Sequence, residues 1–224
     1  MRETATGLIF HGIGLPRRDL EPGEACYWIS VARFERILDQ VQAAPCPDRI
    51  RLSFDDGNAS DHDIALPRLL ARGLRADFFV LTGRIGQKGS LSVDQIRARA
   101  AAGMAVGSHG VAHLNWRQLD EAALGAELAG SRAALEALLA RPVTTAGIPF
   151  GAYDARVLRA LRRAGYAVAY SSDRGRMRTD AFLRPRTSVR TAMNDLELAA
   201  ILAHRMSLGQ RMRRTIGMTR RRWL

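Results

Sequence analysis

The stretch Arg51-Leu52-Ser53-Phe54-Asp55-Asp56-Gly57 decides the fold of this 224-residue chain. Ile50 to Phe54 has the mostly apolar composition of a short parallel strand that is buried on both faces. Ligands of α/β folds bind beyond the carboxyl ends of such strands, where Asp55 and Asp56 stand. Adjacent carboxylates repel, so each needs a cation, a hydrogen-bond donor or a proton. Because Asp and Gly are also ordinary turn residues, this stretch alone leaves a surface turn open.

A second strand, Met104 to Val106, runs into a glycine and then into His109 and His113. We expect a helical turn here, which would place positions i and i+4 on one face and let both imidazoles reach one ion. Two imidazole nitrogens and one carboxylate make the three-ligand set of a hydrolytic metal site. Two polar histidines at a helix start are the alternative, and the aspartate pair after a neighbouring strand favours the metal site.

Three motifs, taken in order, resemble the polysaccharide deacetylase family (carbohydrate esterase family 4). They are Ser-Phe-Asp-Asp-Gly at 53–57, Ser-His-x-x-x-His at 108–113 and Ile-Pro-Phe-Gly at 148–151. The resemblance extends over roughly Leu8 to Val189, and its first two motifs are the specific ones. It implies a hydrolase that removes acetyl groups from a polysaccharide or oligosaccharide, with N-acetylhexosamine as the expected unit and metal-bound water as the nucleophile.

The resemblance also assigns roles to the motif residues. Asp55 is expected to be the general base, and Asp56, His109 and His113 are expected to hold a divalent metal. Zn²⁺ is the expected ion, with Co²⁺, Ni²⁺ or Mn²⁺ as alternatives. Phe150 stands where an aromatic residue of the family gives its backbone N–H to the oxyanion. A core phenylalanine beside a turn is the other interpretation of Phe150.

The chain departs from the family pattern where an arginine often orients the catalytic aspartate. Gly147 occupies that position, and we expect Arg186 to reach in from a later strand instead. The other interpretation is that Arg186 is simply one of many arginines in a chain whose only lysine is Lys88.

A second departure concerns the family's late histidine, the general acid for the leaving group. After His113 the only histidine is His204, which lies within a predicted helix. His11 follows the apolar strand Leu8-Ile9-Phe10, much as the late histidine of the family follows its own strand. The chain therefore resembles the circularly permuted branch of the family, in which this strand stands at the front, and His11 is expected to be the general acid. A loop histidine held by hydrogen bonds is the alternative.

Strand and helix patterns alternate about six or seven times, which predicts a parallel sheet or barrel. Ser30, Ser92, Asp120 and Asn194 have the character of N-caps at helix starts. The family resemblance implies an α/β fold of the distorted, incomplete (β/α)7 type. We expect a single catalytic domain over residues 1–200, with a polar loop over the active face at 17–24, and a basic tail over residues 201–224.

Composition narrows the class of protein. A formal net charge of +12 invites a nucleic-acid partner, but the few aromatic residues do not interleave with the dense arginine cluster at the end of the chain, so we expect none. Cys26 and Cys46 form no CxxC or disulfide ladder, which fits a reducing compartment. We find no secretory signal and no bilayer-spanning stretch, and we expect a cytoplasmic enzyme acting on an acetylated glycan.

The arginine-rich tail is expected to be a solvated helix, with peripheral contact to an anionic inner membrane as the alternative. Two other functions stay open. The same constellation could hydrolyse a non-sugar amide, or the chain could be a catalytically weak glycan-binding module, which the missing third-motif arginine favours.

Overall fold

The computed structural model describes residues 3–205, 209, 212 and 215–219. Within these residues the main sheet runs in the order β10-β8-β7-β6-β5-β4-β1-β11, and every neighbouring pair in it is parallel. Two further pairings stand outside this order: β9 lies antiparallel to β1, and β2 pairs with β3. The strands are β1 (Thr4–Phe10), β2 (Gly12–Ile13), β3 (Trp28–Ile29), β4 (Ile50–Phe54), β5 (Ala76–Val80), β6 (Ala105–Ser108), β7 (Thr145–Gly147), β8 (Val168–Ser171), β9 (Arg176–Arg178), β10 (Leu183–Pro185) and β11 (Thr187–Ser188).

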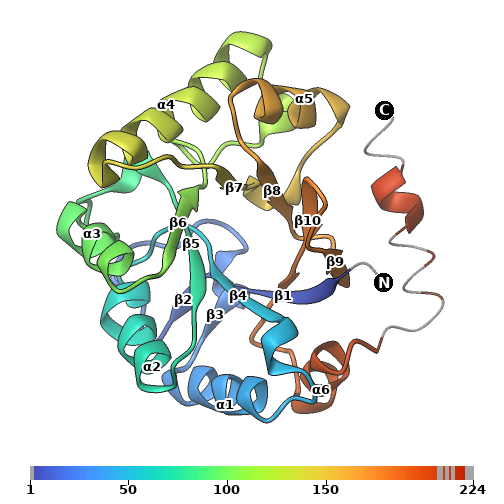
Figure 1. Ribbon diagram of the computed structural model, residues 1–224. Coiled ribbons are helices and arrows are strands. Elements are labelled where there is room, and N and C mark those ends of the chain that lie inside the picture. The colour runs from blue at the N-terminus through green and yellow to red at the C-terminus, as the bar shows by residue number, and fades with distance from the viewer. Residues whose placement is uncertain (1–2, 206–208, 210–211, 213–214, 220–224) are drawn as a thin grey trace.

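One segment closes the sheet into a barrel. β10 pairs with β8 and β11 pairs with β1, although only Arg186 separates the two strands. The backbone N–H of Arg186 donates to Ser171 O at 2.9 Å, so this segment spans both ends of the sheet. Counting β10 and β11 as one crossing segment, the barrel has seven positions, and the expected distorted (β/α)7-type fold is confirmed (Figure 1).

The helices lie around the outside of this barrel (Figure 1). All four predicted N-caps, Ser30, Ser92, Asp120 and Asn194, accept a backbone N–H in the first turn, and Ser92 forms a full capping box with Gln95. The helices are α1 (Val31–Gln42), α2 (Leu66–Ala71), α3 (Val93–Ala101), α4 (Glu121–Leu139), α5 (Ala155–Arg163) and α6 (Asp195–Leu202).

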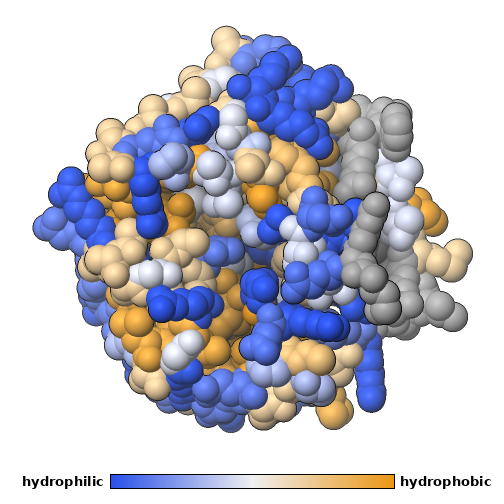
Figure 2. All heavy atoms as spheres, viewed as in Figure 1, coloured by the Kyte–Doolittle hydropathy of each residue, from blue (hydrophilic) through white to orange (hydrophobic). Residues whose placement is uncertain are grey.

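Apolar side chains from strands and helices form the buried core. On the face shown in Figure 2, hydrophilic and apolar residues alternate along the outer rim. The rings of Phe10, Phe54 and Phe78, from three adjacent strands, stack in a row with centroids 5.1 and 4.7 Å apart, and Phe34 of α1 packs edge-on against Phe10. Offset and edge-on aromatic pairs of this kind stabilise beyond their buried area. They fix the ends of β1 and β4, from which His11 and the aspartate pair follow.

The helix after β4 begins as a π-helix at Asp61–Ala65, and α2 continues it. Proline lacks an N–H, so Pro67 cannot make the ordinary bond to the preceding turn, which favours the wider turn. In the basic tail, which was expected to be solvated, Met218 is buried in a hydrophobic cluster that also contains Leu128, Leu161 and Leu183.

Half of the basic tail for which membrane contact is the alternative, namely residues 206–208, 210–211, 213–214 and 220–224, lies outside the described residues. In the part of the chain that the structure describes, no helix is long and apolar enough to cross a membrane.

Candidate active site

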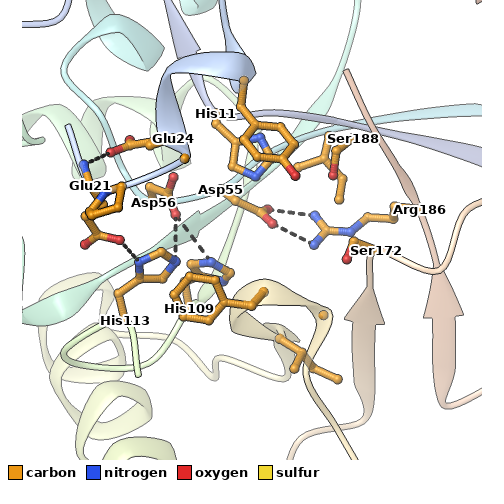
Figure 3. A pocket seen from close by; sticks show the side chains of 17 residues that line it. His11, Glu21, Glu24, Asp55, Asp56, His109, His113, Ser172, Arg186 and Ser188 are labelled. Atoms are coloured by element: carbon orange, nitrogen blue, oxygen red, sulfur yellow. Dashed lines mark hydrogen bonds and ion pairs between the residues drawn. The ribbon is translucent and has the colours of Figure 1, made fainter. Parts of the chain in front are cut away.

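A cavity of about 300 Å³ opens at the carboxyl ends of the barrel strands. The loop after β1 brings His11 to it, the loop after β4 brings Asp55 and Asp56, and the closing segment brings Arg186 (Figure 3). The loop expected to cover this face contributes Glu21, Pro22, Gly23 and Glu24. All seven residues predicted for the site line this one cavity: His11, Asp55, Asp56, His109, His113, Phe150 and Arg186.

Backbone strain is concentrated here. Asp56, His113 and Phe150 have φ of 76°, 55° and 57°, in the left-handed region that non-glycine residues avoid. Such conformations cost of order 1–3 kcal/mol each and persist where the surrounding structure imposes them, which happens mostly at functional sites. Gly57 follows at φ 70°, a conformation that glycine adopts without strain.

The carboxylate of Asp56 faces both histidines. Its Oδ1 lies 3.4 Å from His109 Nε2 and 3.5 Å from His113 Nε2. Each Nδ1 has an acceptor of its own, since His109 contacts Gly147 O at 2.9 Å and His113 contacts Glu21 Oε2 at 2.8 Å. A proton on each Nδ1 leaves the Nε2 lone pairs directed at the carboxylate.

This arrangement fits a divalent cation. Three potential ligand atoms, one from each residue of the set, lie within 4.8 Å of one another. Asp56 Oδ1 is buried and has no hydrogen-bond partner among the described residues. A buried carboxylate oxygen without a partner is costly, and a cation shared with two imidazoles would compensate it.

Asp56, His109 and His113 influence one another's pKa. Burial raises the pKa of Asp56, but the neighbouring histidines outweigh burial and hold that pKa well below its usual range. Burial lowers the pKa of His109, yet the carboxylates of Asp55 and Asp56 raise it overall. Burial and the nearby His109 lower the pKa of His113. A cation at this site would therefore compete with a proton, chiefly the one on His109.

The predicted helical turn at His109–His113 is wrong. His109 follows β6, and the chain to His113 is an irregular loop with Gly110 at φ 87°. The buried carboxylate of Glu127 explains the difference, because it accepts the backbone N–H groups of Val111 at 2.9 Å and Ala112 at 3.1 Å. The loop thereby brings the two rings to a centroid distance of 5.5 Å without helical geometry.

Sequence reasoning missed Glu127, although a signal was present. Along α4 the buried positions are Leu124, Glu127, Leu128, Ser131 and Leu135, so a glutamate interrupts an apolar stripe at helical spacing. A charged residue in such a stripe needs a buried partner, which here is the backbone of the histidine loop.

Asp55 is held by Arg186. The guanidinium donates from Nη1 to Oδ1 at 2.7 Å and from Nη2 to Oδ2 at 2.8 Å, and Nη1 also donates to Ser53 Oγ at 2.8 Å. Both side chains are buried. Burial raises the pKa of Asp55, but the charges of Arg186 and His109 and the paired hydrogen bonds outweigh it, so the pKa is lowered. The carboxylate is therefore ionised near neutral pH.

Two glycines leave room for this arginine. A Cβ at Gly147, the position where the family often has its own arginine, would lie 3.3 Å from Arg186 Nη2. A Cβ at Gly7 would lie 2.8 Å from Arg186 Cγ. The guanidinium also lies over Phe79, at 4.8 Å from the ring centroid. The structure thus brings Arg186 to Asp55 through space that Gly147 leaves open.

His11 and Phe150 flank the aspartates and histidines. The His11 ring lies 4.7 Å from the Tyr27 ring, and His11 Nδ1 is buried with no hydrogen-bond partner in the described part of the chain. Phe150 is 60% exposed, so its interpretation as a core residue is wrong. Its ring lies 4.4 Å from that of His113. His204 lies away from the cavity and contacts Thr6 Oγ1 at 2.5 Å.

Fold and site together define a barrel protein with a candidate metal centre and a separately held carboxylate. The family model for polysaccharide deacetylases matches residues 42–169, more than half of the chain. The chain belongs to this family.

The chain is also similar to individual proteins. YxkH of Bacillus subtilis (strain 168) is 27% identical over 131 residues, which are 58% of this chain and 47% of YxkH, so the match spans about half the length of that curated relative. Among solved structures, the Streptococcus pyogenes deacetylase PplD in complex with acetate is similar with a TM-score of 0.77 and 19% identity, over 90% of this chain and 99% of that one. IcaB from Ammonifex degensii gives a TM-score of 0.70 at 21% identity, over 89% and 97% of the two chains. At these identities the likeness concerns the fold.

Proposed function

We propose that this protein is a metal-dependent hydrolase that removes acetyl groups from a glycan, with N-acetylhexosamine as the unit attacked. One observation carries this proposal. Asp56, His109 and His113 converge on one point, while the adjacent Asp55 stays outside that set and is fixed by Arg186. A ligand trio beside an independent, ionised carboxylate is what hydrolysis of an amide or ester requires.

The donor set supports Zn²⁺ as the ion, because two imidazole nitrogens and one carboxylate oxygen suit its ligand preferences. When bound, such a cation supplies Lewis acidity, which activates water and polarises the acetyl carbonyl. Asp55 would take the proton of the attacking water. Its lowered pKa keeps it ionised for this step, and the two hydrogen bonds from Arg186 fix its orientation.

Two further residues would complete the reaction. As the carbon–nitrogen bond breaks, the leaving amine needs a proton, and His11 lines the same cavity as a candidate donor. The negative charge that develops on the carbonyl oxygen needs a hydrogen-bond donor. The backbone N–H of Phe150 is the candidate, and the left-handed conformation of this residue is the kind of strain found where a backbone group has a function.

The glycan-binding module loses its main support. It was favoured by the missing third-motif arginine, yet Arg186 forms the buried pair with Asp55 from another strand. Tyr27, Ser172 and Ser188 also line the cavity and offer a ring and hydroxyls suited to a sugar. We propose residues 1–200 as the catalytic unit, because every candidate residue falls within that range.

Acetate release from N-acetylated chito-oligosaccharides by the Zn²⁺-loaded full chain tests this function. We expect release that stops after metal removal and returns when Zn²⁺ is added. Parallel assays with O-acetylated glycan and with a cyclic amide separate the ester and non-sugar alternatives. Stoichiometric Zn²⁺ binding without release from any of these substrates would contradict the enzymatic proposal.

A further inference from the structure

Glu21 contacts the candidate metal site although it belongs to none of the sequence motifs. It lies in the loop between β2 and the 3-10 helix Glu24–Tyr27, outside the segment matched by the family model. Its Oε2 accepts from His113 Nδ1 at 2.8 Å (Figure 3). Its Oε1 forms an ion pair with Arg84.

The loop that carries Glu21 is fixed on its other side. The carboxylate of Glu24 accepts the backbone N–H of Glu21 at 2.9 Å and is paired with the guanidinium of Arg18. Arg18 Nε in turn donates to Asn58 Oδ1 at 3.0 Å, and Asn58 Nδ2 donates to the carbonyl of His11 at 3.0 Å. These contacts fix the position of Glu21 relative to Asn58 and thus to the loop that bears the aspartate pair.

The two candidate histidine ligands differ in what stands behind them. His109 Nδ1 contacts a neutral backbone carbonyl, that of Gly147, whereas His113 Nδ1 contacts a full carboxylate. A carboxylate behind a ligating imidazole keeps the proton on Nδ1, fixes the ring and makes Nε2 a stronger donor. The Nε2 atom of His113 is the one that faces Asp56.

We propose that Glu21 is a positioning residue that sets the tautomer and orientation of His113 and thereby strengthens metal binding. This inference rests on the proposed metal site. A purely structural role is the competing account, in which Glu21 only ties its loop to the barrel through Arg84 and His113.

The affinity for Zn²⁺, measured by competition with a chromophoric chelator, separates these accounts. Glu21→Ala removes the acceptor and should weaken Zn²⁺ binding about 10–100-fold, the usual effect of losing such a partner. Glu21→Gln keeps an acceptor oxygen without the charge and should give a smaller loss. Arg84→Met removes the other tie of the loop while keeping the carboxylate, and its affinity should stay within about 3-fold of wild type.

Controls distinguish a failure of the Glu21 inference from a failure of the proposed function. Thermal unfolding of the metal-free proteins checks that Glu21→Gln is folded. We expect it to fold, because the Glu21 side chain is partly exposed. The visible absorption spectrum of bound Co²⁺ should change in both Glu21 variants and not in Arg84→Met. A wild-type chain that binds no Zn²⁺ would overturn the proposed function. Wild-type affinity in Glu21→Ala, or an equal loss in Arg84→Met, would overturn this inference alone.

Discussion

The segment that matches the family model and the two segments flanking it bring different groups to the cavity. Residues 42–169 carry the candidate ligands Asp56, His109 and His113 together with Asp55. The flanks carry His11 before this segment and Arg186 after it. In the proposed mechanism the central segment binds the ion, and the flanks orient the base and supply a proton.

The candidate ligands and the flanking residues are encoded in the sequence in different ways. Candidate ligands sit within a few residues of each other and of a strand end, so short motifs record them. The flanking residues come together only because the segment 183–188 pairs with both β8 and β1. Closure of the barrel, rather than a local pattern, brings Arg186 to Asp55.

Replacement of either adjacent aspartate by asparagine should have the largest effect on turnover. Asp55→Asn should keep bound Zn²⁺ but lose about 10²–10⁴-fold in turnover, the usual contribution of a general base. Asp56→Asn should lose Zn²⁺ affinity as well. Metal analysis and acetate release check both, with Asp63→Asn as a control, since that acid pairs with Arg17 near the surface. Equal metal loss in the two variants would show that the roles are assigned wrongly.

Replacement of Arg186 by Met should be next in size. It leaves the buried Asp55 carboxylate without its guanidinium, and breaking a buried pair costs about 3–5 kcal/mol. Turnover should fall by less than in Asp55→Asn, because the base remains but is no longer oriented. Arg184→Met, two positions earlier and half-buried, is the matched control.

The pH dependence of stability checks the same pair. The lowered pKa of Asp55 contributes stability above the ordinary pKa of aspartate, about 4, and this contribution is lost as the pH falls. Denaturant titrations at several pH values measure the free energy of unfolding. For metal-free Arg186→Met, this free energy should lack the increase with pH that Asp55 contributes in the wild type. An identical pH dependence in wild type and variant would exclude the pair as a source of stability.

Much of the fold was predictable from sequence, because strands, caps and apolar stripes are local. Ile50–Phe54 is a strand as predicted, and Phe34, Ile37, Leu38 and Val41 form the buried stripe of α1. The irregular shape of the loop from His109 to His113 could not be predicted from the loop itself. It depends on Glu127, a residue 14 positions beyond His113. Glu127 at least interrupts the apolar stripe of α4, whereas Glu21 has no local signal, because its contact with His113 joins residues 92 positions apart.

Zinc binding should depend on pH through His109. The carboxylates around it raise its pKa, so the proton that Zn²⁺ must displace persists to a higher pH than for an ordinary histidine. Affinity should fall about tenfold per pH unit for each displaced proton once the pH drops below that pKa. Calorimetry in buffers of different ionisation enthalpy measures the protons released. A pH-independent affinity between about 5 and 8 would contradict this coupling.

The smallest effect concerns Phe150. Glycine accepts positive φ without the penalty of about 1–2 kcal/mol that other residues pay, so Phe150→Gly should not destabilise the fold. Because the backbone N–H remains, turnover should stay within about tenfold of wild type. Ala140→Gly, at φ 51° at the end of α4, is the control for the backbone effect alone. A loss of about 10²–10³-fold in Phe150→Gly would assign the role to the side chain.

The most direct test of the division between segments is the turnover of His11→Ala on two acetyl substrates, with bound Zn²⁺ quantified in the same samples. An N-acetylated sugar has a poor leaving group that needs a proton, whereas p-nitrophenyl acetate has one that leaves unaided. If the flank supplies the proton and the central segment holds the ion, Zn²⁺ content should match wild type. Turnover of the amide should then fall about 10²–10⁴-fold, while that of the ester changes little. Loss of Zn²⁺, or equal losses on both substrates, would contradict the account.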